Sequence, residues 1–565
     1  MHRFLDLPFV RVLIPLAPLS LLAPLSPLAL LAPCAAQEPP IPAGFTRQDQ
    51  LRGSITPERE WWDVLHYELS LQVFPETRSL KGCNTISFRT TKPGDRMQVD
   101  LQPPLAITRV AHDGQDLEFE RDGKVWWITL PAELAADVEA SVQVFYEGKP
   151  VQSQRPPWSG GLSWRKDEKG NHFIATTCQG IGASIWWPNK DHGYDEPDRG
   201  MDIRVTVPAG LTAVANGRLQ SSNRDDEACT ATFHWRVVNP INNYGVNVNI
   251  GNYVPMRSVF EGEGGELDLE YWVLEHQQEE ARRQFAEVPR TLAAFEHWFG
   301  RYPFYKDSYK LVVVPYLGME HQSSVTYGNG FQNGYRGRDL SGTGVGLEFD
   351  FIVVHESAHE WWGNNISMRD AADMWIHESF ANYAENLFVE YHFTEQKAQD
   401  YVIGCRALIR NDRPIIGTYG VNHSGSGDMY YKGGNMLHTM RHVLDDDEKW
   451  RGMLRGLNEE FWHRTVTTAE IEASISRRCG FDFGPVFDQY LRTTDIPVLR
   501  YRAEGDSVSV WWQDVVPGFR VPVLLRINGE ERRVTIGEQP TEVALAGTLE
   551  SLELDRNFYM KVERP

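Results

Sequence analysis

The sequence predicts three domains in order: an N-terminal antiparallel β domain, an α-rich middle domain and a small C-terminal β-sandwich. Three observations support this order. The 565 residues are too many for one hydrophobic core, and 41% of them are hydrophobic, enough for several. Residues 61–255 read as short strands of β-forming residues separated by turn residues. From about residue 277 apolar residues recur at helical spacing, and the strand pattern returns from about residue 496.

The first 36 residues have the composition of an export signal. Arg3 begins a run rich in Leu, Pro and Ala that ends in small residues at Ala36, which is typical of a cleaved signal peptide. Two alternatives stay open. An uncleaved membrane anchor would be kinked by prolines, and lipid attachment at Cys34 would place Pro33 where a small residue is expected. We therefore expect an exported protein, periplasmic or extracellular, either soluble or tethered by its signal or a lipid.

The remaining boundaries follow from changes in pattern. Residues 37–60 are polar and contain proline, which predicts an extended lead-in. Residues 61–255 form the first β domain, which we expect to contain two sheets. Residues 256–495 form the α-rich domain, with a small sheet at its start, and residues 496–565 form the β-sandwich.

Charge and cysteine content narrow the possible partners. The formal net charge is −21, and no run of Lys or Arg offsets it, which argues against nucleic acid or an anionic membrane as a partner. No second apolar stretch is long enough to span a bilayer, so we expect no stable membrane insertion after signal removal. The cysteines show no C-x-x-C spacing, so a metal held by sulfur is not expected, and their pairing stays open. The oligomeric state is not indicated.

A motif in the α-rich domain predicts a metal site. The segment FIVVHESAHEWW places His355, Glu356 and His359 in the pattern H-E-x-x-H. Histidines four residues apart project from one face of a helix, so both imidazoles can reach one ion. A second helical stretch, about residues 372–393, places Glu378 eighteen intervening residues after His359. Two histidines and one carboxylate hold a catalytic Zn²⁺ with a fourth position open for water, so we predict a zinc hydrolase.

Two further carboxylates are placed to support this chemistry. Glu356 adjoins the first ligand and can take a proton from the water. Glu385 lies seven residues after Glu378, two turns along the same helix face, and can accept a proton from a ligand imidazole. Plainer interpretations stay open on spacing alone: histidines satisfied by carbonyl groups inside a core helix, and a solvated Glu385.

Three more segments complete a family pattern. Glu320 follows a buried strand in PYLGMEHQSSVTYGN, Tyr430 begins YYKGG, and Gln179 lies in a predicted turn of the β domain within ATTCQG. Together with H-E-x-x-H and Glu378, these segments resemble the M1 family of zinc aminopeptidases over about residues 60–530. The resemblance implies that the N-terminal domain is a β saddle and that the α-rich domain is a thermolysin-like catalytic domain.

The resemblance also implies the metal site and the base. One Zn²⁺ per chain would be held by His355, His359 and Glu378, and Glu385 matches a family glutamate behind a ligand histidine. Glu356 would act as general base and later as general acid.

The other roles concern the substrate. Glu320 would grip the free amino terminus of a peptide, with Gln179 helping from the saddle side. An exopeptidase must recognise an ammonium group, and a desolvated carboxylate does so with a charge-assisted hydrogen bond. Tyr430 would donate to the oxyanion of the tetrahedral intermediate, an interaction strongest in the transition state. The alternatives are an ordinary strand-end carboxylate, a packed aromatic ring and a surface amide.

One motif departs from the family. G-x-M-E-N reads Leu317-Gly318-Met319-Glu320-His321 here, and the resemblance places Gly318, Met319 and His321 along the substrate. Leu317 replaces Gly and is expected to narrow the first side-chain pocket or alter the edge where substrate backbone lies. His321 replaces Asn and can still donate a hydrogen bond, but it titrates, so we expect activity to gain a pH dependence. Both changes bear on substrate preference rather than on the reaction.

We therefore expect an aminopeptidase that removes single residues from peptides with a free N-terminus. The enzymatic rival is a thermolysin-like endopeptidase, which shares the two histidines and distal glutamate but has no use for an ammonium clamp. The rival from another class is a catalytically silent peptide-binding member of the fold. Many family members carry a large helical domain where this chain has residues 496–565, so we expect an open site that admits longer peptides.

Overall fold

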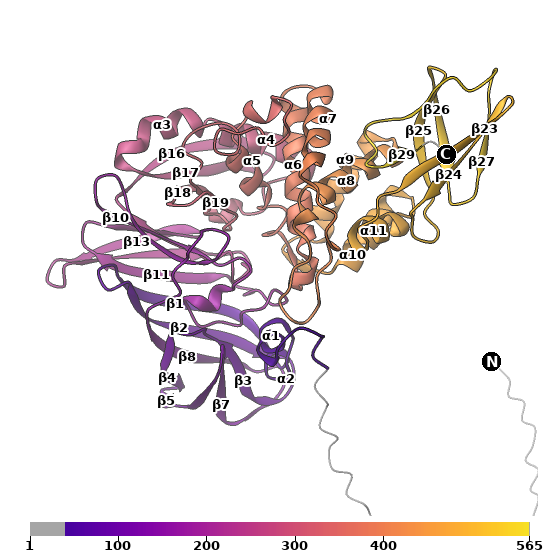
Figure 1. Ribbon diagram of the computed structural model, residues 1–565. Coiled ribbons are helices and arrows are strands. Elements are labelled where there is room, and N and C mark those ends of the chain that lie inside the picture. The colour runs from indigo at the N-terminus through magenta and orange to yellow at the C-terminus, as the bar shows by residue number, and fades with distance from the viewer. Residues whose placement is uncertain (1–39, 564–565) are drawn as a thin grey trace, which may run out of the picture. The chain divides into compact units, whose positions relative to one another are not determined.

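The computed structural model describes residues 40–563. The predicted signal peptide, with its possible cleavage or lipid attachment, lies outside these residues. In the described part, a β-rich segment is followed by an α-rich segment and then by two small sheets (Figure 1). This order confirms the predicted fold class.

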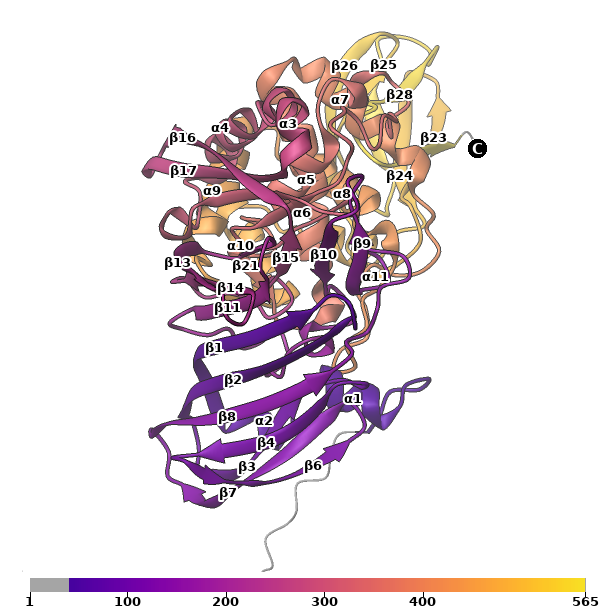
Figure 2. The ribbon, with the colours of Figure 1, turned by 90° about the vertical axis from the view of Figure 1, so that its left-hand side faces the viewer.

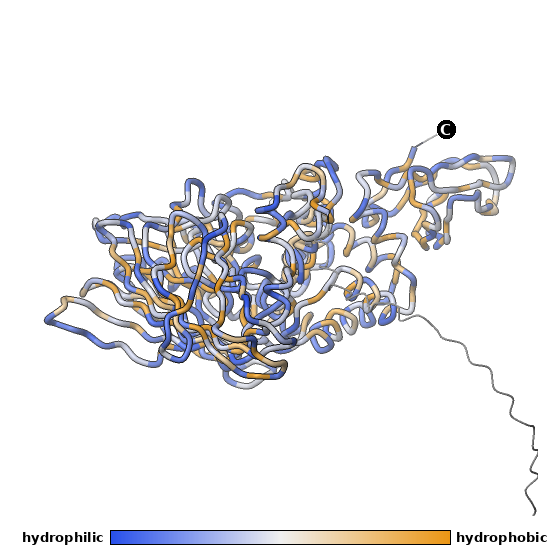
Figure 3. The backbone as a smooth tube through the Cα atoms, turned by 90° about the horizontal axis from the view of Figure 1, so that it is seen from below, coloured by the Kyte–Doolittle hydropathy of each residue, from blue (hydrophilic) through white to orange (hydrophobic). Residues whose placement is uncertain are grey.

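The N-terminal domain is built on an eight-stranded sheet with the order β13-β14-β11-β1-β2-β8-β4-β5. Buried and exposed positions alternate along much of β1, because successive side chains of a strand point to opposite faces. Figure 3 colours the backbone by hydropathy and shows hydrophobic and hydrophilic residues interspersed along the chain. Its strands are β1 (Trp62–Phe74), β2 (Ser79–Thr90), β4 (Ala106–His112), β5 (Gln115–Asp116), β8 (Glu139–Gly148), β11 (Met201–Pro208), β13 (Arg218–Asp225) and β14 (Thr230–Val237).

Two smaller sheets accompany it, so the expectation of two sheets was too low by one. The pairing is antiparallel except between β1 and β11, which run parallel. The strands of the smaller sheets are β3 (Gly94–Asp100), β6 (Glu118–Asp122) and β7 (Val125–Leu134), and β9 (Gly161–Lys166), β10 (His172–Thr177), β12 (Thr212–Ala215) and β15 (Val248–Gly251). Strand β10 ends two residues before Gln179, so Gln179 lies in the turn that follows this strand.

The predicted extended lead-in is wrong in part, because it contains two short helices, α1 (Arg47–Gly53) and α2 (Pro57–Glu60). Thr46 and Asp49 form a reciprocal capping box at the start of α1, which satisfies two backbone N–H groups that would otherwise lack partners. Buried Arg59 of α2 donates to Asp100 of β3 at 2.7 Å. The lead-in is therefore fixed to the β domain.

A five-stranded sheet begins the catalytic domain, in the order β16-β17-β18-β20-β19. Its strands are β16 (Tyr253–Gly262), β17 (Gly265–Leu274), β18 (Tyr309–Val313), β19 (Gly318–Met319) and β20 (Val325–Tyr327). The predicted boundary between residues 255 and 256 therefore cuts β16, a strand of this sheet. Glu320 directly follows the edge strand β19, as expected from its segment.

Helices make up most of the rest of this domain, and Figure 2 shows them beside its sheet. The central helix α6 buries 15 of its 18 residues. The helices are α3 (Gln278–Gln284), α4 (Glu287–Phe299), α5 (Phe351–Ala358), α6 (Trp375–His392), α7 (Glu395–Gly404), α8 (Tyr431–Leu444), α9 (Asp447–Glu460), α10 (Thr468–Cys479) and α11 (Gly484–Arg492). Two short strands, β21 (Ile366–Met368) and β22 (Arg464–Val466), pair in parallel.

Helix α5 carries H-E-x-x-H and is anchored at its start. Asp350 caps it by accepting from the N–H groups of Ile352 and Val353, and it also accepts from the Tyr327 hydroxyl of β20 at 2.8 Å. The cap therefore ties the helix to the sheet. The helix ends at Ala358, earlier than the sequence indicates, but His359 keeps helical dihedral angles and stays on the same face as His355.

The C-terminal segment forms two facing sheets of four and three strands. Its strands are β23 (Val498–Glu504), β24 (Ser507–Gln513), β25 (Val521–Ile527), β26 (Glu530–Ile536), β27 (Thr541–Ala544), β28 (Leu552–Leu554) and β29 (Lys561–Glu563). Within residues 40–563, no helix has the length and apolar character needed to cross a membrane.

Candidate active site

Three side chains from α5 and α6 converge on one point. The Nε2 atoms of His355 and His359 lie 3.7 Å and 3.5 Å from Oε2 of Glu378. One ligand atom from each of the three residues lies within 4.8 Å of the others, and all three residues are buried. The spacing of H-E-x-x-H and the position of Glu378 at the start of α6 thus bring the residues together.

Both imidazoles are held so that Nε2 faces this point. Nδ1 of His355 lies 2.7 Å from Oε1 of Glu385, and Nδ1 of His359 lies 2.8 Å from the carbonyl oxygen of Trp362. Each acceptor fixes the proton on Nδ1 and leaves the Nε2 lone pair free. Glu385 is itself held by the Tyr401 hydroxyl at 2.6 Å.

The three residues fit a divalent metal ion. Oε2 of Glu378 is buried and has no hydrogen-bond partner, which costs free energy unless a cation occupies the point it faces. Burial raises the pKa of Glu378, but the neighbouring imidazoles of His355 and His359 outweigh burial and hold that pKa well below its ordinary value. Two neutral imidazoles and one carboxylate are the donor set that zinc accepts in open catalytic sites.

Glu356 faces the same space from α5. Together with Glu320 and His359, it offers an atom to a second group whose members lie within 4.8 Å of one another. Burial raises the pKa of Glu356 to about 8, and a base whose pKa is close to the working pH is effective in proton transfer. Gly318 of β19 leaves room here, because a Cβ at that position would lie 3.3 Å from Oε1 of Glu356 and 2.6 Å from Ile352.

A carboxylate cluster lies beside the metal ligands. Nε2 of Gln179 donates to Oε1 of Glu320 at 2.6 Å and to Oε1 of Glu378 at 3.0 Å. Burial raises the pKa of Glu320 above its ordinary value. One amide from the β domain therefore joins the proposed amine anchor to a metal ligand.

Tyr430 precedes α8 and is half-buried beside the site. Its ring stacks on that of His355, with centroids 6.0 Å apart. Burial, and then the Glu378 and Glu320 carboxylates, raise the pKa of Tyr430 well above its ordinary value. The phenol therefore stays protonated and can donate a hydrogen bond.

The side chains on either side of Glu320 in the G-x-M-E-N segment have little exposed surface. Met319 is buried, and Leu317 packs into the main hydrophobic core. The expected titration of His321 is wrong, because burial lowers its pKa to about 3 and the ring stays neutral. Its Nδ1 lies 3.3 Å from the Thr326 hydroxyl.

Sequence reasoning missed two residues that lie against Glu320, Tyr244 and Asn364. The Tyr244 hydroxyl lies 3.2 Å from Nδ1 of His377 and close to Glu320. Nδ2 of Asn364 donates to the Glu320 carbonyl at 2.9 Å. The Gly-Asn pair after H-E-x-x-H was a local signal for Asn364, whereas nothing near Tyr244 in the sequence marks it.

Two family models match this chain. The peptidase M1 N-terminal domain matches residues 64–244, and the peptidase family M1 domain matches residues 283–490. Together they cover more than half of the sequence, in the order of the two domains that build the site. The fold and the converging ligands define a metallopeptidase architecture. The chain belongs to the M1 peptidase family.

Individual relatives are distant. A leucyl aminopeptidase from Saccharolobus solfataricus is 20% identical and matches over 87% of this chain and 62% of its own length. A leukotriene A-4 hydrolase from Xenopus laevis is 23% identical, over 73% of this chain and 67% of its own. This chain spans 58–63% of the length of three curated relatives.

A solved structure has the same fold. An M1 zinc metallopeptidase mutant from Deinococcus radiodurans, bound to a Tyr-Ser-Ala substrate, has a TM-score of 0.66 at 21% identity, and the match covers 79% of this chain and 98% of that one.

Replacing Glu385 by Gln should weaken metal binding without changing the shape of the site. The amide can still accept from Nδ1 of His355, but it lacks the charge that makes the ring a stronger ligand. We expect zinc affinity to fall about 10–100-fold, as measured by competition with a fluorescent chelator. Exposed Glu459→Gln on α9 is the matched control and should bind zinc as the parent does. Equal affinities for both variants would contradict the orienting role of Glu385.

Proposed function

We propose that this protein is a zinc-dependent aminopeptidase that hydrolyses the N-terminal residue from peptides. His355, His359 and Glu378 hold the metal in this proposal. The observation that carries it is the position of Glu320, whose carboxylate lies within 4.8 Å of ligand atoms of Glu356 and His359. A carboxylate so near the scissile position limits how much peptide can precede the cleaved bond.

The charge of the site favours an ammonium group. Glu320 is buried, and its side-chain hydrogen-bond partners among the described residues are neutral: the Gln179 amide and the Tyr244 phenol. A buried carboxylate without a cationic partner is costly. The free amino terminus of a peptide supplies the missing charge through a charge-assisted hydrogen bond. The Saccharolobus solfataricus relative described above is named as a leucyl aminopeptidase, which agrees with this assignment.

The protein's own groups then have distinct tasks. When bound, zinc supplies a Lewis acid that polarises the peptide carbonyl and acidifies water. Glu356 takes a proton from the attacking water and later gives one to the leaving amine. Tyr430 donates to the oxyanion as it develops, and Glu320 with Gln179 holds the amino end in register.

A pair of matched substrates tests the proposal. Aminoacyl chromogenic substrates should be turned over, whereas their N-acetylated forms, which lack the ammonium group, should not. Zinc content measured by mass spectrometry should be one per chain, and chelation should remove both metal and activity. Equal turnover of free and acetylated substrates would instead indicate an endopeptidase. A metal-free protein indifferent to chelators would indicate a binding protein.

We also propose that the protein is exported, on the basis of residues 1–36 alone. Mass analysis of the protein recovered from its native host should find an N-terminus near Gln37, or an acylated Cys34 if a lipid tethers it. An unprocessed Met1 in a cytoplasmic fraction would contradict export.

A further inference from the structure

A cavity lies between the C-terminal halves of α6, which carries Glu378, and α8, which directly follows Tyr430. Its volume is about 190 Å³, room for several water molecules or for a small organic ion. We call it the α6–α8 cavity. It is lined by Asn386, Glu390, Glu395, Ala398, Gln399, His438, Arg441, His442, Asp445 and Asp447. None of these residues belongs to the candidate active site.

Two buried side chains of this cavity have polar atoms without a hydrogen-bond partner. Asn386 of α6 is 1% exposed, and neither its Oδ1 nor its Nδ2 has a hydrogen bond. His438 of α8 is 2% exposed, and its Nδ1 has none. Because Nε2 of His438 lies 3.0 Å from Oδ1 of Asn557, that nitrogen carries the proton and Nδ1 keeps a lone pair. The lining therefore offers two unused acceptors, and unpaired buried groups of this kind call for a bound partner.

The charges of the cavity favour a cation. Arg441 is fully engaged, because it binds Glu390 through two hydrogen bonds of 2.6 Å and 2.8 Å and Asp447 through one of 2.7 Å. It is therefore not free to hold an anion. Asp445 pairs with Arg533 of β26 at 3.3 Å. In the described part of the chain Glu395 has no cationic partner, and its carboxylate accepts from the Gln399 amide at 2.9 Å. The four carboxylates outnumber the two guanidinium groups, so the cavity is negative.

The cavity has no cluster of metal-ligating side chains. Among residues 40–563, both groups of three His, Cys, Asp or Glu close enough to chelate one ion are at the candidate active site. A larger cation with several N–H donors can span the acceptors of the α6–α8 cavity.

We propose that the α6–α8 cavity binds an organic cation, an alkyl ammonium or guanidinium compound, with its N–H groups on His438, Asn386 and the acidic rim. Asn386 directly follows Glu385, the residue that orients His355, on α6. His438 lies on α8, which begins directly after Tyr430. The occupant would therefore bridge the two helices behind the catalytic groups, and it should stabilise the protein by binding the folded state.

Agmatine, which carries a guanidinium and an ammonium group, is a suitable probe. Calorimetry on the zinc-loaded Glu320→Gln variant, whose active-site amine anchor is neutral, should show one binding site and a rise in melting temperature. N-butylurea, an uncharged molecule of similar shape at one end, should not bind. Asn386→Leu should weaken agmatine about tenfold, the effect of losing one hydrogen bond to a charged group.

Two variants make the result decisive. Glu395→Gln changes only the exposed rim, should fold normally and should weaken agmatine several-fold. Glu448→Gln on α9, an exposed carboxylate outside the cavity, should bind agmatine as the parent does. The proposal is overturned if no heat appears at millimolar agmatine, which would indicate a water-filled cavity. It is also overturned if Glu395→Gln and Asn386→Leu bind as the parent does, or if binding requires an intact Glu320.

Discussion

Glu356→Gln should retain zinc and lose nearly all turnover. The substitution keeps the shape of the side chain beside Gly318, and Glu356 is not one of the three residues that converge at Oε2 of Glu378. It removes the carboxylate that takes the proton from water, and general-base catalysis of this kind contributes about 10²–10⁴-fold. We expect kcat to fall by at least that factor on an aminoacyl chromogenic substrate.

Zinc content and substrate affinity provide the controls for Glu356→Gln. Metal analysis should still find one zinc per chain, and a peptide should bind well enough for its affinity to be measured in the absence of turnover. If the variant loses its zinc, Glu356 holds the metal instead. If it keeps zinc and near-parental kcat, another group is the base.

Tyr430→Phe should lower kcat and kcat/KM together by about 10²-fold, with little change in KM. The hydroxyl is a protonated donor next to Glu378, and its role is limited to the charge that develops in the transition state. The Phe ring preserves the stacking on His355. Steady-state kinetics on a free-amine substrate measure the effect.

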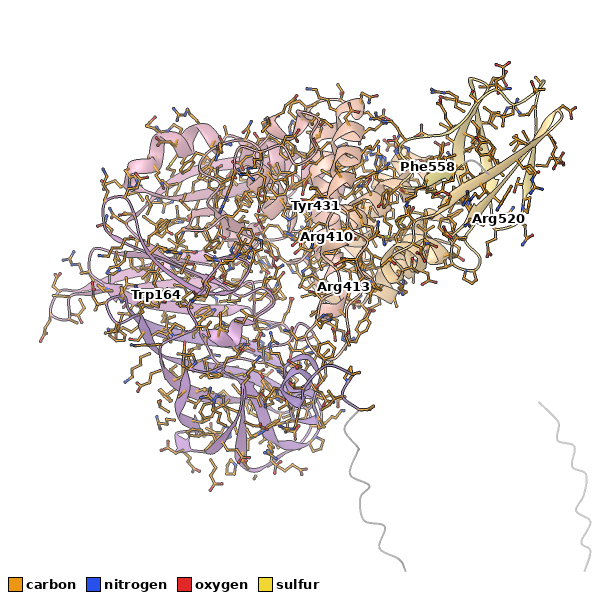
Figure 4. The ribbon with its side chains drawn as sticks, in the orientation of Figure 1. Trp164, Arg410, Arg413, Tyr431, Arg520 and Phe558 are labelled. Carbon is orange, nitrogen blue, oxygen red and sulfur yellow. The ribbon has the colours of Figure 1, made fainter. Side chains whose placement is uncertain are left out.

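The neighbouring tyrosine is a matched control for Tyr430. Tyr431 is half-buried, and its ring lies 6.4 Å from that of Tyr430, but no hydrogen bond of its hydroxyl is found in the described structure. Figure 4 labels it on the catalytic domain, above Arg410 and Arg413. Tyr431→Phe should leave kcat within about twofold, since nothing buried is left unpaired. If Tyr430→Phe instead raised KM and left kcat unchanged, the Tyr430 phenol would bind the substrate rather than the oxyanion.

The local part of the site could be predicted from the sequence because helix geometry determines it. The two histidines are four positions apart, and Glu378 and Glu385 are seven positions apart, so in each case both members lie on one helix face. These spacings correctly indicate which side chains meet. The same reasoning gives Glu320 at the end of an edge strand.

Contacts between distant segments could not be predicted in this way. Gln179 and Glu320 are 141 residues apart, and only the family resemblance linked them. Tyr244 gives no local signal. The burial of His321 depends on neighbours from the sheet, so its residue type alone suggested a titration that its surroundings prevent. In the lead-in, proline and polar residues outweighed the capping box at Thr46, which is a stronger local signal for a helix start.

Because Gln179 donates to both Glu320 and Glu378, the candidate active site depends on the β domain as well as on the catalytic domain. A fragment containing only the catalytic domain would keep every metal-binding residue yet lose the amide that links Glu320 to Glu378. Two carboxylates would then repel each other across the place where the substrate's amino group belongs. Under the proposed function, selectivity for peptide ends is shared between two modules, and a chimera with another relative's saddle would exchange that selectivity while keeping the metal-binding residues.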